Sequence, residues 1–469
     1  MPPSNHRPAA GNQSRRRRPF TDSRAAALAV LSRIGSGAVT LDQVLDQMAP
    51  QTSGLSTRDR ALFNQLVYGV LRWRLRLDAV IETFADRPVK KLSPLVLNIL
   101  RLGLLQILFM DRIPPSAAVN TAVNLARSHR AGKAAGFVNA LLRNVLRDPG
   151  RFVLPDAASR PVDHMALDKS FPHWLVSRWI DRYGTSQTAA LCDVMNSVPP
   201  LTLRCNFLKN NLVQLVEALY EQAADLQPLD ALPGALNLTG PRCPIHEMQA
   251  FIDGRFAVQD GAAQLVSLLL SPQPDETILD ACAGLGGKTT HIAGLMQNRG
   301  CVVALDNAKS KLTRLQDEAH RQGISIIRTS PADLHQPLSM APHSSFDRVL
   351  LDAPCSGLGV LRRNPDAKWS FPKKDIDRYA ARQLRFLENL APWVKPGGVL
   401  VFSVCSMEPE ENEGVIKRFL KNHPNFVINH AQAIEEKSVH PFLNQDGFLR
   451  IIPHNHQMDG FFAARLSRC

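Results

Sequence analysis

The chain has 469 residues, a length that predicts two or three domains rather than one core. Hydrophobic residues make up 45% and charged residues 21%, which excludes a largely disordered chain. The formal net charge of +13 is uneven: residues 1–150 carry 22 Lys/Arg against 9 Asp/Glu, whereas residues 151–469 carry 33 of each. A basic part beside a neutral part predicts polyanion binding by the first, although a basic surface can also serve solubility alone.

Cysteine usage and hydropathy exclude several classes of protein. The eight cysteines form no C-x-x-C pair, which argues against a zinc site and against a secreted disulfide framework. The N-terminus lacks the apolar core of a signal peptide. The most apolar stretch, 95–110, contains Asn98, Arg101 and Gln106 and is shorter than the ~20 residues of a membrane helix. We therefore expect a cytoplasmic protein with no metal and no membrane partner. The sequence leaves its oligomeric state open, with a monomer as the expectation.

The first third of the chain divides into a tail and a helical domain. Residues 1–19 predict a disordered basic tail, in which Arg15 to Arg18 could contact phosphates or simply be solvated. Over 20–150, apolar residues recur at helical spacing, which predicts an all-α domain with helices at 23–35, 57–73, 94–109, 116–128 and 133–146. We expect several arginines on its outer faces: Arg72, Arg74, Arg76, Arg127, Arg130, Arg143 and Arg147.

Two further domains are predicted beyond residue 150. Residues 151–256 indicate a small α+β linker domain, with a strand at 201–209 and a helix at 211–222. From 257 to 469, short apolar runs alternate with helices such as 309–322 and 375–390, which predicts a doubly wound, Rossmann-like α/β domain. Its parallel strands are expected at 277–282, 301–306, 325–329, 346–352 and 398–405. Ligands of such a sheet bind at the carboxyl ends of the strands.

A glycine-rich turn follows the first of these strands. The sequence LDACAGLGGKTT at 279–290 has glycines that allow a ligand close to the backbone, before a helix whose N-terminus offers free N–H groups. A phosphate-binding P-loop would need glycine where Cys282 stands, and a dinucleotide fingerprint would need it at Thr289. A nucleoside-cofactor turn remains. Asp306, at the end of the next strand, suits ribose hydroxyls, although such an aspartate alone is more often a helix cap.

Two cysteines lie where two later strands end. Cys355 follows Asp352-Ala353-Pro354, and Cys405 stands within Val404-Cys405-Ser406, ahead of an acidic stretch that begins at Glu408. This pairing suits methylation of cytosine C5, in which a thiolate adds to C6 and makes C5 nucleophilic toward a sulfonium methyl. The thiolate must be accessible and its pKa must be lowered by cationic surroundings. This chemistry leaves both cysteines open as the nucleophile. The other six are expected to be structural.

Several segments together resemble a known family. RALFNQLVYGVLRWR at 60–74 and GFVNALLRNVLR at 136–147 are similar to the NusB-like RNA-binding domain. GRFAVQDGAAQ at 254–264, the two cysteine motifs and DGFFAARL at 459–466 resemble the RNA cytosine-C5 methyltransferases of the NOL1/NOP2/Sun family. The resemblance covers nearly the whole chain. It implies S-adenosylmethionine as cofactor and small-subunit ribosomal RNA as substrate and partner.

The resemblance also assigns roles to individual residues. It implies that Cys405 is the nucleophile and that Cys355 assists release of the product. Among the acids, it places Asp306 at the ribose, Asp333 near the adenine, and Asp352 near the methionine part and the target base. The implied cofactor loop comprises Cys282, Ala283, Gly284, Leu285, Gly286, Gly287 and Lys288.

The chain departs from the family pattern at three places. Leu285 replaces the usual proline and Gly284 the usual alanine in the loop, which alters its rigidity. Val404 replaces the usual threonine before the nucleophile, which removes a hydroxyl. The Gly-Asp that contains the adenine-side acid becomes Ser-Pro-Ala-Asp at 330–333, with one residue inserted.

A basic stretch after the Pro-Cys motif raises the question of RNA contact. Residues 361–385 hold eight Lys/Arg and three Asp, and we expect Arg362 and Arg363 to contact RNA, with Trp369 stacking or packing. The residues from Lys373 to Arg385 could equally form a solvated helix face. Two rival functions also stay open: a DNA cytosine-C5 methyltransferase with Cys355 as nucleophile, and an RNA-binding adaptor with an inactive methyltransferase fold.

Overall fold

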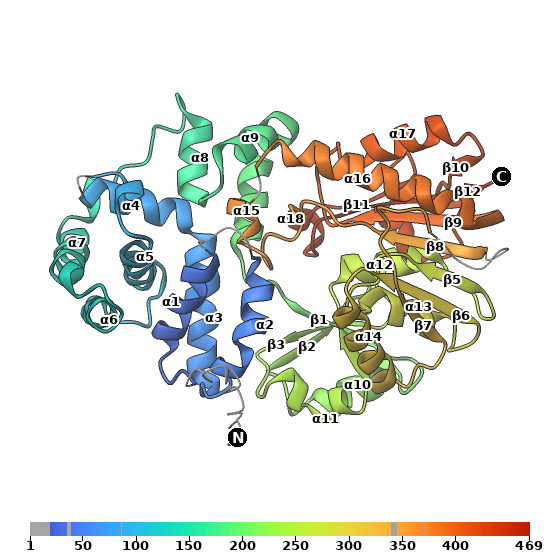
Figure 1. The fold of residues 1–469 in the computed structure, drawn as a ribbon, viewed down its shortest axis with the longest axis horizontal. Helices are drawn as coiled ribbons and strands as arrows, with labels where there is room; N and C mark the ends of the chain where they lie inside the picture. Colours follow the sequence, from blue (N-terminus) through green and yellow to red (C-terminus); the bar gives the residue numbers. More distant parts are fainter. Residues whose placement is uncertain (1–18, 35–38, 86, 339–344, 371) are drawn as a thin grey trace, which may run out of the picture. The chain divides into compact units, whose positions relative to one another are not determined.

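The computed structural model describes residues 19–34, 39–85, 87–338, 345–370 and 372–469. The run from Arg15 to Arg18 therefore lies outside the described residues. The chain separates into two compact units, Met1–Ser170 and Phe171–Cys469 (Figure 1).

The first unit is helical and packs around one apolar core. Its middle helix, α5, buries nearly every side chain from Ile99 to Gln106, as expected for its continuous apolar sequence. Each predicted helix is present, with ends within two residues of the prediction, whereas α2 and α4 were not predicted. The helices are α1 (Ser23–Ile34), α2 (Leu41–Thr52), α3 (Thr57–Arg72), α4 (Arg74–Ala85), α5 (Pro94–Phe109), α6 (Pro115–Ser128), α7 (Ala135–Arg147) and α8 (Pro161–Lys169), with short 3-10 turns at Val89–Lys91, Gly132–Ala134 and Pro149–Arg151.

The predicted outer-face arginines of this unit divide into two groups. Four are exposed as expected: Arg127, Arg130, Arg143 and Arg147. The prediction is wrong for Arg72, which is only 8% exposed, because it lies at the junction between the end of α3 and the start of α4. Arg74 is half-buried, and so is Arg76, which forms an ion pair with Asp168 at 2.8 Å.

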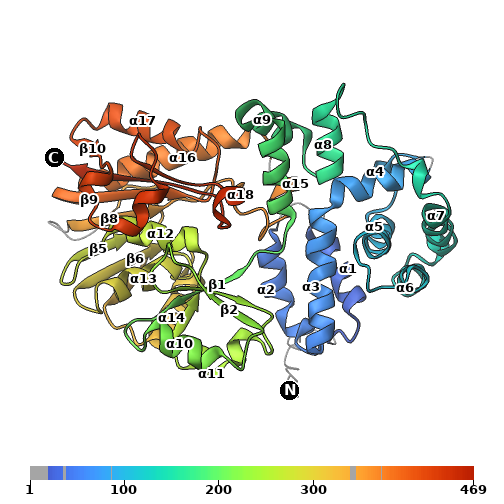
Figure 2. The same cartoon turned by 180° about the vertical axis from the view of Figure 1, so that it is seen from behind.

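The second unit begins with a small antiparallel sheet of order β2-β3-β1-β4. The small sheet packs against α10 and α11 (Figure 2). Leu203 and Cys205 of β1 lie in the apolar core between them, and Thr202 and Arg204 alternate to the other face of the strand. The predicted strand at 201–209 and helix at 211–222 are present but shorter. The elements are α9 (His173–Asn196), β1 (Leu201–Cys205), α10 (Leu212–Leu219), β2 (Asp225–Pro228), β3 (Ala235–Thr239), a 3-10 turn at Ile245–Glu247, α11 (Gln249–Ile252) and β4 (Phe256–Val258).

The larger sheet is doubly wound, as predicted. Its order is β10-β12-β9-β8-β5-β6-β7, with β11 paired to β12. The five strands β5, β6, β7, β8 and β9 are mutually parallel. Strand residues alternate between two cores: Ile278 packs toward α12 and α13, and Leu279 toward α16 and α17. The strands are β5 (Thr277–Asp280), β6 (Cys301–Asp306), β7 (Ile327–Pro331), β8 (Phe346–Asp352), β9 (Val394–Val404), β10 (Phe426–Ile428), β11 (Phe448–Ile451) and β12 (Phe461–Arg468).

Helices cover both faces of this sheet (Figure 1). They are α12 (Gly261–Leu270), α13 (Gly287–Leu295) and α14 (Lys309–Gln322) on one face, and α16 (Asp375–Leu390) and α17 (Glu413–Asn422) on the other. This part of the chain also contains the short helices α15 (Ala367–Ser370) and α18 (Pro453–His456), and 3-10 turns at Ala391–Trp393, Ala431–Ala433 and Lys437–Phe442. Among the described residues, no helix is both long and apolar enough to cross a membrane.

One strand differs from its prediction. β9 begins at Val394, before the Pro396-Gly397-Gly398 segment that the sequence indicates as a turn before the strand. The pairing with β8 jumps there from Val394 to Val399, so the turn is a bulge inside the strand. Gly397 adopts a φ of 74° in this bulge, which glycine tolerates without strain.

The domain limits at 150/151 and 256/257 stay a prediction. The structure groups α8 with the helical unit and pairs β4 with β1 of the small sheet. The helical unit therefore extends beyond the first predicted limit, and β4 runs across the second.

Candidate active site

The carboxyl ends of four neighbouring parallel strands carry three predicted site residues and one further acid, Asp280. Asp280 and Asp306 end β5 and β6, Asp352 ends β8, and Cys405 directly follows β9. Because β6, β5, β8 and β9 are adjacent in this order and parallel, these residues share one edge of the sheet. Asp333 lies two residues beyond β7, at the same edge, where it is exposed and accepts a hydrogen bond from the His335 N–H at 3.0 Å.

The glycine loop wraps onto the end of β6. The Gly284 N–H donates to Asp306 Oδ2 at 3.1 Å, and the Ala283 N–H donates to the Leu305 carbonyl at 2.8 Å. Gly286 has a φ of 87°, and a Cβ there would meet the Leu315 side chain at 2.5 Å, so only glycine fits. The loop thereby reaches the N-terminus of α13 and presents its backbone N–H groups at the strand ends.

The remaining loop residues differ in exposure. Cys282 and Ala283 pack into apolar clusters, which agrees with a structural role for that cysteine, and burial raises its pKa. Leu285 is 47% exposed. Gly287 is the first residue of α13.

Lys288 links the loop to the end of β8. Its Nζ lies 2.6 Å from Asp352 Oδ2, and Ser403 Oγ donates to Asp352 Oδ1 at 2.7 Å. Burial opposes charge on this lysine, but Asp352 and the nearby Cys405 outweigh it, so the pKa of Lys288 is raised. A buried cation therefore stands beside Cys405, as the predicted thiolate chemistry requires.

Asp280 is a buried carboxyl that the sequence reasoning did not select as a site residue. It is 1% exposed, and burial raises its pKa to about 6 even though Thr289 Oγ1 donates to it at 2.7 Å. Its place immediately before the glycine loop was the available signal.

The two candidate cysteines meet at the ends of β8 and β9. Cys355 Sγ lies 3.2 Å from Cys405 Sγ. The contact with Cys405, together with burial, raises the pKa of the Cys355 thiol well above its ordinary value. The Gly359 N–H also donates to the Cys405 carbonyl at 3.0 Å, so the loop after Cys355 crosses back over Cys405. The structure therefore brings together both thiols, Lys288 and Asp352.

The expected RNA contact is wrong for Arg362, and for Arg363, which is 30% exposed, it stays a prediction. Arg362 has a side chain only 2% exposed, and its Nε lies 2.7 Å from Asp459 Oδ1. Arg363 pairs with Asp260 at 2.8 Å and with Asp459 at 2.5 Å. Both arginines neutralise two buried carboxylates, which the sequence spacing could not reveal because Asp260 and Asp459 lie about a hundred residues away on either side. Trp369 is half-buried.

Comparison with known proteins identifies this architecture. Family models match three segments: 16S rRNA methyltransferase RsmB/F at 267–467, the NusB family at 21–147, and the RsmF/B-like ferredoxin-like domain at 171–246. The probable ribosomal RNA small subunit methyltransferase B of Synechocystis sp. is 39% identical over 91% of this chain and 95% of its own length. Its Bacillus subtilis counterpart is 37% identical over 89% and 92%. The crystal structure of PH0851 matches with a TM-score of 0.79 and 26% identity, covering 96% of this chain and all of that one.

This chain belongs to the RsmB/F family of 16S rRNA methyltransferases. As an RsmB/F member it has an N-terminal NusB domain, a ferredoxin-like domain and a C-terminal methyltransferase domain. The resemblance inferred from the sequence is confirmed, and so is the predicted fold class.

The structure also shows where two departures from the family pattern, Val404 and Gly284, lie in the fold. Val404 is fully buried in the core beneath α16 and α17, on the opposite face of β9 from Ser403. Its replacement of threonine therefore changes the core side of the strand rather than the side that carries Asp352 and Ser403. Gly284 has a φ of 57° with open space around a notional Cβ, so flexibility at this point of the loop is the main consequence.

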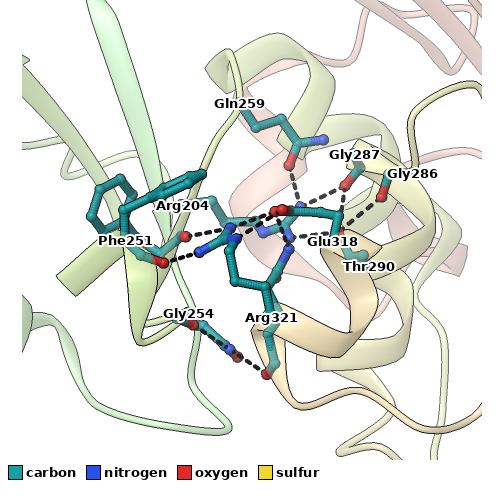
Figure 3. A network of polar contacts seen from close by, with 12 residues as sticks. Arg204, Phe251, Gly254, Gln259, Gly286, Gly287, Thr290, Glu318 and Arg321 are labelled. Atoms are coloured by element: carbon teal, nitrogen blue, oxygen red, sulfur yellow. Dashed lines mark hydrogen bonds and ion pairs between the residues drawn. The ribbon is translucent and has the colours of Figure 1, made fainter. Parts of the chain in front are cut away.

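A buried arginine couples the ferredoxin-like domain to the glycine loop of this RsmB/F chain. Arg204, on the outer face of β1, donates to the Gly287 carbonyl at 2.6 Å and to Gln259 Oε1 at 2.5 Å (Figure 3). It also donates to Thr290 Oγ1 and Gln322 Oε1, at 3.0 and 3.2 Å. Sequence reasoning missed this role, although a lone arginine between Leu203 and Cys205 in an apolar strand was a usable signal.

A third missed residue is Glu411, which stands in the acidic stretch after Cys405. It is fully buried, and burial raises its pKa even though four groups donate hydrogen bonds to it. A run of acids normally predicts a solvated segment, so its burial could not be inferred from composition.

Proposed function

We propose that this RsmB/F chain transfers a methyl group from S-adenosylmethionine to C5 of a cytosine in small-subunit ribosomal RNA, with Cys405 as the covalent nucleophile. The observation that carries the proposal is the 3.2 Å approach of Cys355 and Cys405, beside the Lys288–Asp352 ion pair. Two thiols and a buried cation at one sheet edge match the needs of C6 addition.

The residues at this edge fit a nucleoside cofactor. Gly286 holds a turn that no larger residue could adopt, and α13 begins at the next residue with its N–H groups facing the strand ends. Asp306 lies at the end of β6 within hydrogen-bond reach of the loop, where its carboxylate suits ribose hydroxyls. We assign Asp333, two residues beyond β7, to the adenine, and Asp352 to the methionine part and the target base. When bound, S-adenosylmethionine supplies an electrophilic methyl group on a sulfonium.

The proposed reaction begins at the Cys405 sulfur. As a thiolate, stabilised by the nearby Lys288 cation, it forms a bond to cytosine C6 and drives electron density to C5. C5 then takes the methyl group as the sulfur–methyl bond of the sulfonium breaks and its electron pair stays on the sulfur. Loss of the C5 proton to a base restores the C5–C6 double bond and expels Cys405 as a thiolate. Reaching C5 in this way requires an unpaired or flipped cytosine.

Cys355 is suited to assist the last step. Contact with Cys405 and burial raise the pKa of the Cys355 thiol, so Cys355 keeps its proton. Its S–H can then donate a hydrogen bond to the Cys405 sulfur as the bond to C6 breaks. This division of labour supports Cys405 as nucleophile and Cys355 as the residue that aids product release.

The experiment uses labelled S-adenosylmethionine with small-subunit ribosomal RNA or duplex DNA, and the wild type, Cys405→Ala and Cys355→Ala proteins. We expect labelling of RNA by the wild type, none with Cys405→Ala, and a denaturation-resistant protein–RNA adduct with Cys355→Ala. Both variants should bind the cofactor with wild-type affinity by calorimetry, which controls for folding.

The same assay separates the rival functions. Full activity of Cys405→Ala with complete loss in Cys355→Ala would reverse the assignment of the nucleophile. Labelling of DNA but not RNA would overturn the substrate, and RNA binding without any methyl transfer would favour an inactive adaptor.

A further inference from the structure

Glu411 lies between the two segments that carry the cysteines. It follows Cys405 by six residues and is fully buried. Its neighbour Glu408, also fully buried, is paired with Arg178 at 2.7 Å and Arg182 at 3.0 Å, so this part of the chain is anchored on α9. Among the residues that the structure describes, no arginine or lysine forms an ion pair with Glu411, and its contacts are hydrogen bonds from neutral groups.

Four hydrogen bonds converge on the Glu411 carboxylate. Oε1 accepts from the Ser356 N–H at 2.9 Å and from Gln383 Nε2 at 3.0 Å. Oε2 accepts from the hydroxyls of Ser356 at 2.5 Å and Ser406 at 2.7 Å. Both oxygens are therefore saturated, which offsets the cost of burying the group.

The partners of Glu411 explain its importance for the cysteines. Ser356 immediately follows Cys355, and Ser406 immediately follows Cys405. The two hydroxyls also contact each other at 3.1 Å. One carboxylate thus bridges the residues next to both thiols and holds the two loops together at this point.

A carboxylate is better suited to this bridge than an amide of the same shape. Ser406 Oγ already accepts from the Glu408 N–H at 3.2 Å, and Ser356 Oγ from the Leu358 N–H at 3.4 Å. Each hydroxyl therefore uses its own proton toward Glu411. A glutamine NH₂ facing the hydroxyls would bring donors against donors, and the loops would have to move.

We propose that Glu411 is a positioning residue that holds the Cys355 and Cys405 side chains at their mutual contact distance. Its function rests on the proposed cytosine-C5 chemistry, but its effect on the two thiols is independent of any RNA. A displacement of about 1 Å between reacting groups can cost about 100-fold in rate, so the bridge should be visible in catalysis.

The test measures the thiol pair directly. Phenylarsine oxide bonds to two thiols that lie side by side, and its capture is followed by intact-protein mass spectrometry on the full chain. We compare the wild type with Glu411→Ala and Glu411→Gln. The matched control is Glu413→Gln, which alters a carboxylate of the same segment that pairs instead with Arg450 at 2.7 Å. Cys355→Ala and Cys405→Ala each remove one thiol and so give the level of arsenical capture without an adjacent pair.

We expect wild type and Glu413→Gln to capture one equivalent rapidly. Glu411→Gln should capture at least about tenfold more slowly and lose about 100-fold in kcat, with an unchanged KM for S-adenosylmethionine. A purely structural role would lower the melting temperature without this selective loss. If Glu411→Ala does not fold, the double variant Ser356→Ala/Ser406→Ala removes the hydroxyls of the bridge instead and should behave as Glu411→Gln.

Two outcomes overturn the proposal. One is a wild-type protein that captures no arsenical, because the thiols would then not be adjacent. The other is a folded Glu411→Gln protein with wild-type capture and wild-type kcat. If capture depends on Glu411 but no variant methylates RNA, the positioning holds and the proposed function fails, so the two are separable.

Discussion

Basic side chains play different parts in the two units of this protein. In the helical unit, Arg143 and Arg147 are exposed and donate to neutral partners, Asn139 at 3.0 Å and Asn144 at 2.8 Å. In the second unit, Arg204 and Arg362 are 3% and 2% exposed and tie separate segments together. The first unit carries the excess positive charge, and the second balances its charges internally. A count of arginines along a sequence therefore does not locate an RNA-binding surface. An arginine that donates to buried acceptors inside the fold is not available to bind a phosphate.

The largest effect should come from Arg204. Arg204→Ala leaves the Gly287 carbonyl and two glutamine side chains without their donor, and we expect the free energy of unfolding to fall by about 3–4 kcal/mol. Urea denaturation measures this loss. Arg242→Ala, which changes an exposed arginine of the same domain, should cost less than about 0.5 kcal/mol. Equal losses of unfolding free energy in the two variants would mean that the hydrogen bonds of Arg204 do not stabilise the contact between its strand and the glycine loop.

Arg362 should follow closely. Its removal leaves Asp459 and Asp260 buried with Arg363 alone, and we expect Arg362→Ala to destabilise the protein by about 3 kcal/mol. Arg363→Ala should cost about 1 kcal/mol, because that side chain is 30% exposed. Chemical denaturation and RNA-binding titrations are run on the same samples. A stable Arg362→Ala protein with weakened RNA binding would restore the role expected from the sequence.

The smallest effect on stability should come from the exposed arginines. Arg143→Glu/Arg147→Glu should change the free energy of unfolding by less than about 0.5 kcal/mol. If these residues contact phosphates, RNA affinity should fall, and the slope of log affinity against log salt should shrink by about 1.5. Lys417→Glu/Lys421→Glu reverses two exposed charges on α17 and should leave the slope unchanged. Identical slopes for both double variants would argue against a special role of the helical unit.

The sequence predicted elements well where local signals are strong. The limits of α14 and α16 match their predictions because each has a continuous amphipathic pattern. The start of β9 was misplaced because Pro396 and its glycines resemble a turn, whereas the sheet tolerates them as a bulge. The edge that gathers Asp306, Asp352 and Cys405 followed from the prediction of parallel strands, whose carboxyl ends share one edge of the sheet. Long-range partners did not: Arg362 and Glu411 look like surface charges until the fold supplies their acceptors and donors.

Gly359 and Gly460 carry no reactive group, yet they limit how the site can evolve. A Cβ on Gly359 would lie 2.0 Å from the Gly460 carbonyl oxygen and 2.9 Å from that of Cys405. The Gly460 N–H in turn donates to the Gly359 carbonyl at 2.8 Å, so the start of β12 rests against the loop that crosses Cys405. Any side chain at position 359 would therefore displace the backbone of Gly460 or Cys405. Two residues without side chains thus set the spacing between β12 and the segment that carries Cys405.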